Sequence, residues 1–253
     1  MTDFSAPKVS VVTPCHNGAE WLEACYRSLR AQTFEDWEWL IVDDGSSDSS
    51  RDILASLETG DQRVKPTRLT KNAGAGVARN AALDAACGDY LAFLDVDDAW
   101  LPEKLSRQMT VMDEGAGLSF TAYRVRGPSG TAEGVIDRAS PDRATRQDLL
   151  MKRVTMGCST VMARRELVGD KRFPSIRRGQ DFLFWLMLLE EAGEAVKVND
   201  VLSEYRITPG SVSRNKFRKA AGQWWMYRRP LGLSLLVSAF YFFHYAKNAV
   251  FRK

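Results

Sequence analysis

Cysteine and histidine are scarce in this chain of 253 residues. It has four cysteines, none of them in a CxxC pair, and two histidines: Cys15, Cys25, Cys87, Cys158, His16 and His244. Structural zinc sites and disulfide frameworks use such residues at close and regular spacing. The sequence therefore predicts neither, and the thiols are expected to be reduced, as in a cytoplasmic protein.

Patterns typical of a secretory leader or of a membrane-spanning helix are also not seen in these residues. The first residues, "MTDFSAPKVS", lack a basic region followed by an apolar core, so no signal peptide is expected. The apolar stretch from Leu231 to Ala246 contains 16 uncharged residues, fewer than the ~20 that cross a bilayer. This stretch is predicted to be a helix that lies on a membrane surface.

Acidic residues are almost absent from the end of the chain. Residues 204 to 253 hold ten Lys or Arg and one acid, Glu204, so they carry +9 and the rest of the chain −6, given a net charge of +3. A basic segment can bind nucleic acid, but the aromatic run "QWWMYRRP" before the apolar stretch favours a membrane surface. We therefore expect a basic, aromatic, membrane-associating tail over 213–253 and no nucleic-acid partner.

The first hundred residues alternate between strand and helix patterns. The strand "KVSVVTP" precedes a helix over Gly18 to Gln32, and the strand "WEWLIVDDGS" precedes "SSDSSRDILASL", whose Ser and Asp residues suit a helix N-terminus. A weaker strand near Val64, a helix in "GAGVARNAALDAAC" and the strand "DYLAFL" continue the pattern. This order predicts an α/β fold with a mostly parallel sheet flanked by helices.

Three polar clusters, "TPCHN", "DDGSSD" and "DVDD", come directly after predicted strands. Taken singly, the second fits a turn with a helix cap and the first fits an ordinary loop. The carboxyl ends of parallel strands meet at one edge of the sheet, where ligands of such folds bind. We therefore expect all three clusters to line one crevice.

Asp95, Asp97 and Asp98 crowd the end of a buried strand. Two unit charges 4 Å apart repel by about 4 kcal/mol at an effective dielectric near 20, so a positive partner is needed. Oxygen ligands in D-x-D spacing suit Mg²⁺ or Mn²⁺, with the remaining positions left to phosphates or water. A solvated helix cap is the alternative. The preceding buried strand favours a cation that binds together with a nucleotide diphosphate.

Several segments together resemble a known family. "VSVVTPCHNGAEWLEACYRSLRAQTFEDWEWLIVDDGSSD", "KNAGAGVARNAAL" and "GDYLAFLDVDDAWLPEKLSRQ" look like successive motifs of the family 2 glycosyltransferases with the GT-A fold. "GCSTVMARREL", "RRGQDFLFWLMLL" and "YRITPGSVSRNK" are similar to its teichuronic-acid and exopolysaccharide branch. The resemblance covers residues 8 to 250, except for an uninformative linker from Gly127 to Arg143.

This resemblance implies a glycosyltransferase domain over 1–212, with a nucleotide-binding half over about 1–115 and an acceptor half over about 116–212. It implies that Asp95 faces the ribose or the metal and that Asp97 ligates the metal, Mn²⁺ or Mg²⁺. Asp44 would accept a hydrogen bond from the base and Asp43 would support the turn, while Asp98 has a secondary or capping role. The implied donor-binding residues are Thr13, Pro14, His16, Asp43, Asp44, Asn72, Gly74, Arg79, Asp95 and Arg206.

The resemblance also implies that Asp181 in "GQDFLFW" is the catalytic base. Family members often have Glu-Asp here, and this chain has Gln180 before the aspartate. Direct displacement of a sugar needs one carboxylate to take the acceptor's proton and a cation to stabilise the leaving diphosphate. Asp181 could instead cap its helix. We expect the neighbouring side chains Trp185, Leu186 and Leu189 to lie in the core.

Arg206 begins a segment, "RITPGSVSRNK", that contains Ser211, Ser213, Arg214 and Lys216. These residues suit a cationic loop that closes over a diphosphate, and a solvated linker is an equally simple interpretation.

Other classes of protein share some of these patterns. "FLDVDD" resembles the nucleophile motif of haloacid-dehalogenase-type phosphatases, with Asp95 as nucleophile, although that motif normally follows the first strand. "GAGVAR" resembles a dinucleotide-binding fingerprint but has Arg79 in place of the last glycine. A non-enzymatic membrane adaptor would explain the tail and leave the D-x-D unexplained.

The sequence therefore predicts an inverting, metal-dependent glycosyltransferase. Its expected donor is a nucleotide-diphosphate sugar, UDP-linked, and its expected acceptor is a glycan or lipid-linked glycan of a cell-surface polysaccharide. The enzyme is expected in the cytoplasm, peripherally attached by its tail to the inner face of the membrane.

Overall fold

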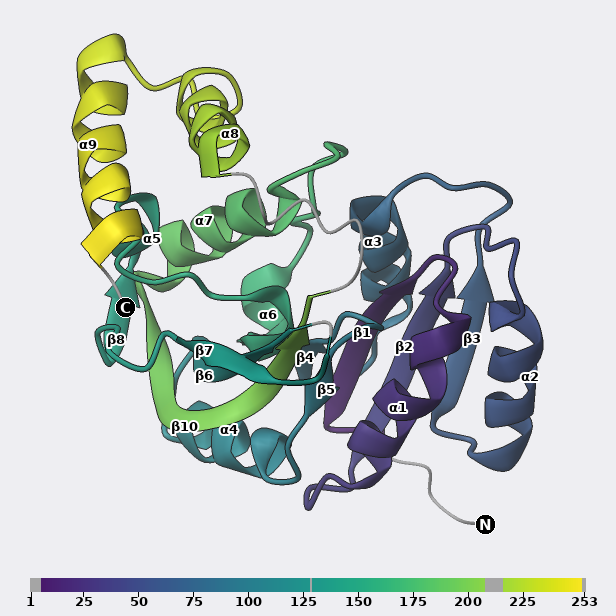
Figure 1. Ribbon diagram of the computed structural model, residues 1–253. Coiled ribbons are helices and arrows are strands. Elements are labelled where there is room, and N and C mark those ends of the chain that lie inside the picture. Colours follow the sequence, from purple (N-terminus) through teal and green to yellow (C-terminus); the bar gives the residue numbers. More distant parts are fainter. Residues whose placement is uncertain (1–5, 128, 208–215, 252–253) are drawn as a thin grey trace.

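The computed structural model describes residues 6–127, 129–207 and 216–251. Its elements, labelled in Figure 1, are β1 (Val9–Cys15), α1 (Ala19–Arg30), β2 (Trp37–Asp43), α2 (Ser50–Gly60), β3 (Val64–Arg68), α3 (Ala75–Ala85), β4 (Tyr90–Phe93), β5 (Ala99–Trp100), α4 (Lys104–Asp113), β6 (Leu118–Arg126), β7 (Ala132–Ile136), β8 (Arg143–Thr145), α5 (Arg146–Leu150), the 3₁₀ turn Cys158–Thr160, β9 (Met162–Arg164), α6 (Arg165–Val168), α7 (Gln180–Ala192), β10 (Glu194–Arg206), α8 (Lys216–Arg228) and α9 (Leu235–Phe251).

The first half of the chain forms the predicted parallel sheet. Strands run in the order β3-β2-β1-β4, and β1 pairs in parallel with both β2 and β4. The three polar clusters therefore end neighbouring parallel strands, as expected, because β1, β2 and β4 lie side by side. The weak strand near Val64 is confirmed as β3. The cap of α2 differs in detail, since the Asp48 carboxylate accepts from the Ser50 N–H at 3.0 Å while Ser49 makes no side-chain cap.

The second half extends this sheet with mostly antiparallel pairs. The order continues β4-β9-β6-β10-β5, with β7 on β6 and β8 on β10, and only β6 and β10 are parallel. The segment from Gly127 to Arg143, which carried no assigned motif, contains β7. Its sequence "AEGVI" is short and its first residues are exposed, so hydrophobic alternation could not reveal it.

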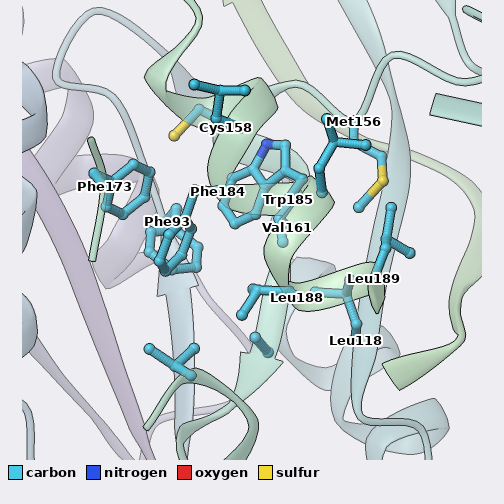
Figure 2. Close-up of a cluster of buried hydrophobic side chains, with 14 of the residues drawn as sticks. Phe93, Leu118, Met156, Cys158, Val161, Phe173, Phe184, Trp185, Leu188 and Leu189 are labelled. Carbon is cyan, nitrogen blue, oxygen red and sulfur yellow. The ribbon is translucent and has the colours of Figure 1, made fainter. Parts of the chain in front are cut away.

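Helix α7 packs into the hydrophobic core through one set of side chains. Six of its residues are buried: Leu183, Phe184, Trp185, Leu186, Leu188 and Leu189. The ring of Phe184 stacks on Phe173 at a centroid distance of 4.0 Å, and Trp185 packs edge-on against Phe93 of β4 at 5.0 Å (Figure 2). The prediction that Trp185, Leu186 and Leu189 belong to the core is confirmed. This packing fixes the first turn of α7 relative to the end of β4.

The C-terminal segment is helical, as predicted, and forms two helices that lie over α5 and α7 (Figure 1). The buried Tyr227 hydroxyl donates to the Leu150 carbonyl at the end of α5, and Asn248 Nδ2 donates to the Met151 carbonyl at 2.8 Å. None of the helices in the described ranges is long and apolar enough to span a membrane. The predicted boundary between domain and tail, 212/213, lies outside the described residues and stays a prediction.

Candidate active site

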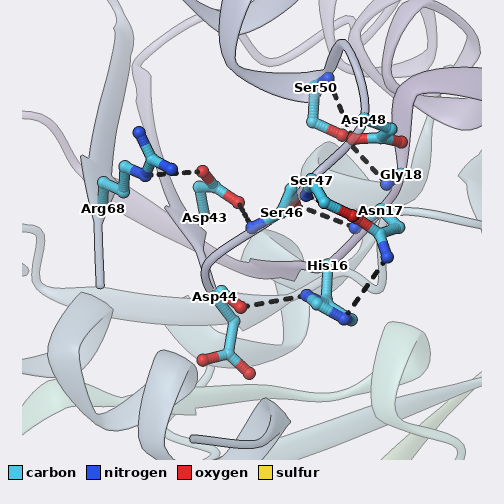
Figure 3. Close-up of polar contacts among 10 residues, drawn as sticks. All are labelled: His16, Asn17, Gly18, Asp43, Asp44, Ser46, Ser47, Asp48, Ser50 and Arg68. Carbon is cyan, nitrogen blue, oxygen red and sulfur yellow. Dashed lines mark hydrogen bonds and ion pairs between the residues drawn. The ribbon is translucent and has the colours of Figure 1, made fainter. Parts of the chain in front are cut away.

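Hydrogen bonds join the turns that follow β1 and β2 (Figure 3). The Asn17 backbone N–H donates to Ser46 Oγ at 2.8 Å, and the Ser47 N–H donates to Asn17 Oδ1 at 2.8 Å. His16 Nδ1 lies 2.9 Å from the Asp44 carbonyl oxygen, while the side chain of His16 remains exposed. The first two sequence clusters thus form one rim, with an imidazole at its surface.

The buried carboxylates of Asp43 and Asp44 both accept hydrogen bonds from the backbone. Asp43 Oδ1 accepts from the Ser46 N–H at 2.9 Å, which agrees with its expected role in supporting the turn. The two oxygens of Asp44 accept from the N–H groups of Ala73 at 2.7 Å and Gly74 at 2.8 Å. Asp44 therefore attaches the loop before α3 to the end of β2, and its contact with a nucleotide base stays a prediction.

Two glycines permit this close approach of loops. Gly45 has φ +68°, and a Cβ there would lie 2.8 Å from the Lys71 carbonyl carbon. Gly74 has φ +96° and immediately precedes α3. Both conformations are unfavourable for residues with a side chain. Asn72, between them in the chain, is exposed at the same rim.

Thr13 and Pro14 lie within β1 and are buried. Thr13 Oγ1 accepts a hydrogen bond from Trp39 Nε1 at 2.7 Å, so the hydroxyl is engaged in the core. The sequence could not reveal this hydrogen bond, because Trp39 is 26 residues away. The donor contact predicted for Thr13 stays a prediction.

Arg79 on α3 lies at the centre of the site. Its Nη2 donates to Asp95 Oδ1 at 2.5 Å, and its guanidinium lies 5.4 Å from the ring centroid of Phe173. Burial lowers the pKa of Arg79, but the charge and hydrogen bond of Asp95, together with Cys158 and Asp181, raise it more, so its net pKa is above the usual value. The guanidinium is thus a permanent buried cation that holds one oxygen of Asp95.

Asp98 is a structural member of the carboxylate cluster. Ser159 Oγ donates to Asp98 Oδ2 at 2.5 Å, and the Arg206 backbone N–H donates to Oδ1 at 3.1 Å. Burial and the charges of Asp97 and Asp95 raise the pKa of Asp98 well above the usual value. Asp98 therefore joins the turn, the 3₁₀ segment and the end of β10.

Asp95 and Asp97 have the donor chemistry of a divalent-cation site. Burial and the neighbouring Asp95 charge raise the pKa of Asp97 to about 6, and a bound cation would favour its ionised form. The described residues include no cluster of three or more His, Cys, Asp or Glu side chains that could hold a metal alone. Two carboxylates suffice for Mg²⁺ or Mn²⁺ when phosphates and water complete the coordination, so these residues fit such a cation.

Asp181 lies in the first turn of α7, after the left-handed Gly179. Burial raises its pKa, and the Arg79 charge partly offsets this effect. Two cavities of about 440 and 920 Å³ meet here, because Asp95, Asp181, Tyr205 and Lys219 line both. We call the smaller one the inner cavity and the larger one the outer cavity.

Arg206 ends β10, and its guanidinium lies 5.4 Å from the Trp21 ring centroid. Its backbone contact with Asp98 places it beside the carboxylate turn. The expected cationic loop cannot be placed further, since Ser211, Ser213, Arg214 and the side chain of Lys216 lie outside the described residues.

The structure adds site residues that sequence patterns did not single out. Tyr123 and Tyr205, on β6 and β10, line the inner cavity, with ring centroids 6.2 Å apart. Lys219 reaches both cavities from α8. These residues are distant in sequence from the D-x-D, and only the pairing of β6 with β10 brings the two tyrosines together.

The sheet order, with carboxylates at the carboxyl ends of its parallel strands, is the arrangement expected of the GT-A fold. The family model described as "Glycosyl transferase family 2" matches residues 10–170. The protein therefore belongs to glycosyl transferase family 2 and is an enzyme. Membership in this family decides against the phosphatase with Asp95 as nucleophile and against the non-enzymatic adaptor.

Two relatives are similar over most of their length. TuaG of Bacillus subtilis (strain 168), whose name assigns it to teichuronic acid biosynthesis as a glycosyltransferase, is 41% identical over 99% of this chain and 98% of that protein. WfgD of Escherichia coli, named UDP-Glc:alpha-D-GlcNAc-diphosphoundecaprenol beta-1,3-glucosyltransferase, is 33% identical over 85% of this chain and 83% of that protein.

A solved structure supports the fold independently. The mannosyltransferase PcManGT of Pyrobaculum calidifontis, in complex with GDP-Man and Mn²⁺, superposes with a TM-score of 0.70 over 98% of this chain and 74% of that protein, at 17% identity. At this identity the likeness establishes the GT-A fold alone.

Proposed function

We propose that this enzyme transfers a sugar, with inversion, from a UDP-sugar to a lipid-linked intermediate of a cell-surface polysaccharide. One observation carries the proposal: Asp181 and Asp95 come from distant elements and line the same two cavities, with the Arg79 cation bonded to Asp95. Such a site offers one carboxylate to the acceptor and another to the donor.

The donor is proposed to bind along the rim formed after β1, β2 and β4. The exposed His16 and Asn72 flank the turn of Asp44, and the backbone of Arg206 contacts the carboxylate cluster at Asp98. Asp95 and Asp97 would hold Mn²⁺ or Mg²⁺, which when bound neutralises charge on the leaving diphosphate. Arg79 fixes the Asp95 carboxylate so that one oxygen remains directed toward the donor.

Asp181 is proposed to take the proton from the acceptor hydroxyl. Its pKa, raised by burial, makes the carboxylate a better proton acceptor than an exposed aspartate. The buried aromatic packing of α7 holds it in place. A single base that assists direct displacement gives a product of inverted configuration, because no enzyme nucleophile intervenes.

The names of the relatives support the donor and acceptor classes. WfgD acts from UDP-Glc on a diphosphoundecaprenol-linked GlcNAc, and a Campylobacter jejuni relative, 27% identical over 85% of this chain, carries a name with a PP-undecaprenol acceptor. TuaG is named for teichuronic acid biosynthesis. We assign this chain to the same class of reaction, with its particular sugar and linkage left to experiment.

The helix α9 is proposed to rest on the membrane that holds the acceptor. Leu236, Phe240 and Phe243 follow each other at helical spacing and are 83%, 52% and 67% exposed. The opposite side of α9 packs on the protein through Tyr241 and Tyr245. The excess of Lys and Arg in residues 204–253 suits the anionic cytoplasmic leaflet, so we place the enzyme at the inner face.

The experiment that tests this function incubates the purified protein with single UDP-sugars, Mn²⁺ and a lipid diphosphate-linked sugar. Transfer to the lipid, with the anomeric configuration of the product read by NMR, is the expected result. Retention of configuration, or an absence of both transfer and UDP-sugar hydrolysis across the common UDP-sugars, would contradict the proposal.

A further inference from the structure

The outer cavity is walled by two separate parts of the chain. One wall comes from Leu149 of α5 and from the segments that follow α5 and precede α7, with Lys152, Val154, Thr155 and Ile176 to Gly179. The other comes from the C-terminal helices, including Lys219, Trp225 and Tyr245. The C-terminal segment is thus part of the site as well as a membrane-facing surface.

Basic side chains outnumber acidic ones around this cavity, and the acidic ones are shared with the inner cavity. Its five basic side chains are Lys152, Arg177, Arg178, Arg218 and Lys219. Its only two acids among the described residues are Asp95 and Asp181, both shared with the inner cavity. Arg177 and Arg178 are exposed, and neither forms an ion pair within the described ranges. The outer part of the cavity is therefore a place for negative charge.

The same cavity offers apolar surface beside its cations. Ile176, Phe182, Trp225, Met226 and Tyr245 contribute to its lining. Trp225 is 46% exposed and belongs to the same helical pair as the exposed apolar side of α9. A ligand that fits both features carries an anionic group and an apolar chain.

The cationic wall is distinct from the proposed donor rim. His16, Asp44, Asn72 and Arg206 do not line the outer cavity. The diphosphate of the donor belongs beside Asp95 and Asp97, and Asp97 does not line the outer cavity either. The arginines before α7 therefore need a different anion.

We propose that the outer cavity binds the diphosphate that links the acceptor sugar to its lipid, with Arg177, Arg178 and Lys219 as its anion-binding residues. This inference rests on the proposed function and names the charged part of its acceptor. The acceptor sugar then points inward to Asp181, and the lipid leaves along the C-terminal helices toward the membrane. Burial lowers the pKa of Lys219, and a bound anion would favour its charged form.

The test measures binding of farnesyl diphosphate to the full chain while UDP and Mn²⁺ saturate the donor site. The double variant Arg177→Gln/Arg178→Gln should bind it about ten- to hundredfold more weakly, as expected for lost charge-assisted hydrogen bonds. Arg30→Gln is the matched control, because Arg30 is exposed at the C-terminus of α1 and lines neither cavity. Farnesol should bind the wild type and the double variant equally.

Three results would overturn the proposal. The first is displacement of farnesyl diphosphate by UDP with Mn²⁺. The second is equal affinity of the wild type and the double variant for farnesyl diphosphate. The third is equal affinity of the wild type for farnesol and for farnesyl diphosphate. This binding measurement does not require turnover, so it separates failure of the acceptor subsite from failure of the proposed transfer reaction. In the transfer assay, the double variant should lose kcat/KM for a diphosphate-linked sugar while it keeps kcat/KM for the same sugar on a phosphate-free lipid.

Discussion

Arg79 Nη2 and Asp95 Oδ1 lie 2.5 Å apart in an ion pair whose arginine is almost fully buried. The pair joins α3, which is attached to β2 through Asp44 and Gly74, to the carboxylate turn after β4. A buried guanidinium with a fixed partner sets the position of the carboxylate oxygen. The donor rim and the proposed metal site are therefore one connected unit.

Substitution of Arg79 should destabilise the protein. Arg79→Met leaves the Asp95 carboxylate without its partner, and removing one member of a buried pair costs about 3–5 kcal/mol. Asp95 is 28% exposed in its side chain, so the lower end of this range is expected. Urea denaturation measures the free energy of unfolding, with Arg30→Met as the surface control. A change no larger than that of the control would mean that the pair contributes nothing to stability.

Asp97→Asn should weaken donor binding that depends on a divalent cation. The substitution removes a ligand charge, and we expect the affinity for UDP with Mn²⁺ to fall at least ~10-fold. The affinity for UDP with EDTA should stay unchanged. Asp36→Asn is the control, since Asp36 is exposed before β2, at the opposite edge of the sheet. Equal Mn²⁺ dependence in wild type and Asp97→Asn would remove Asp97 from the metal site.

The local patterns of the sequence were sufficient for the first half of the fold. The strands "VSVVTPC" and "WEWLIVD" are mostly apolar and are buried at every position, and such runs can be recognised without tertiary information. The convergence of their polar ends followed from parallel pairing alone. Short or exposed strands such as β7 gave no such signal.

Side-chain directions and contacts between distant residues could not be predicted from the sequence. The hydroxyl of Thr13, a residue predicted to bind the donor, accepts a hydrogen bond from Trp39 in the core, and residue spacing does not reveal this partner. The structural role of Asp98, the third carboxylate, depends on a hydrogen bond from Ser159, which is 61 residues away in the sequence. The contribution of Lys219 to both cavities depends on how α8 packs on the domain. Each of these facts is set by tertiary packing, which residue spacing along the chain does not encode.

The exposed apolar side of α9 should govern membrane binding. The triple variant Leu236→Ser/Phe240→Ser/Phe243→Ser removes side chains whose full burial is worth about 1.5–3 kcal/mol each. Partitioning onto anionic vesicles should fall more than ~10-fold in a sedimentation assay. The melting temperature and UDP affinity should stay unchanged, because these side chains are exposed. Vesicle binding equal to that of the wild type would contradict the role assigned to α9.

Asp181→Asn should separate catalysis from stability. Loss of the base should lower transfer about 10²–10⁴-fold, while UDP and Mn²⁺ bind as before. The pKa of Asp181 is raised in the folded state, so ionised Asp181 opposes folding once the pH exceeds the unfolded pKa. The neutral asparagine removes this penalty, and the variant should be at least as stable as the wild type at neutral pH.

The pH profile tests the same assignment in the wild type. Transfer needs the ionised carboxylate, so its rate should rise with pH through the raised pKa of Asp181 and fall below it. The residual activity of Asp181→Asn should lack this decrease of kcat at low pH. A decrease that arises because protonation of Asp97 weakens donor binding would remain visible in KM. An Asp181→Asn enzyme that turns over at the wild-type rate, with the same decrease of kcat at low pH, would show that another group is the base.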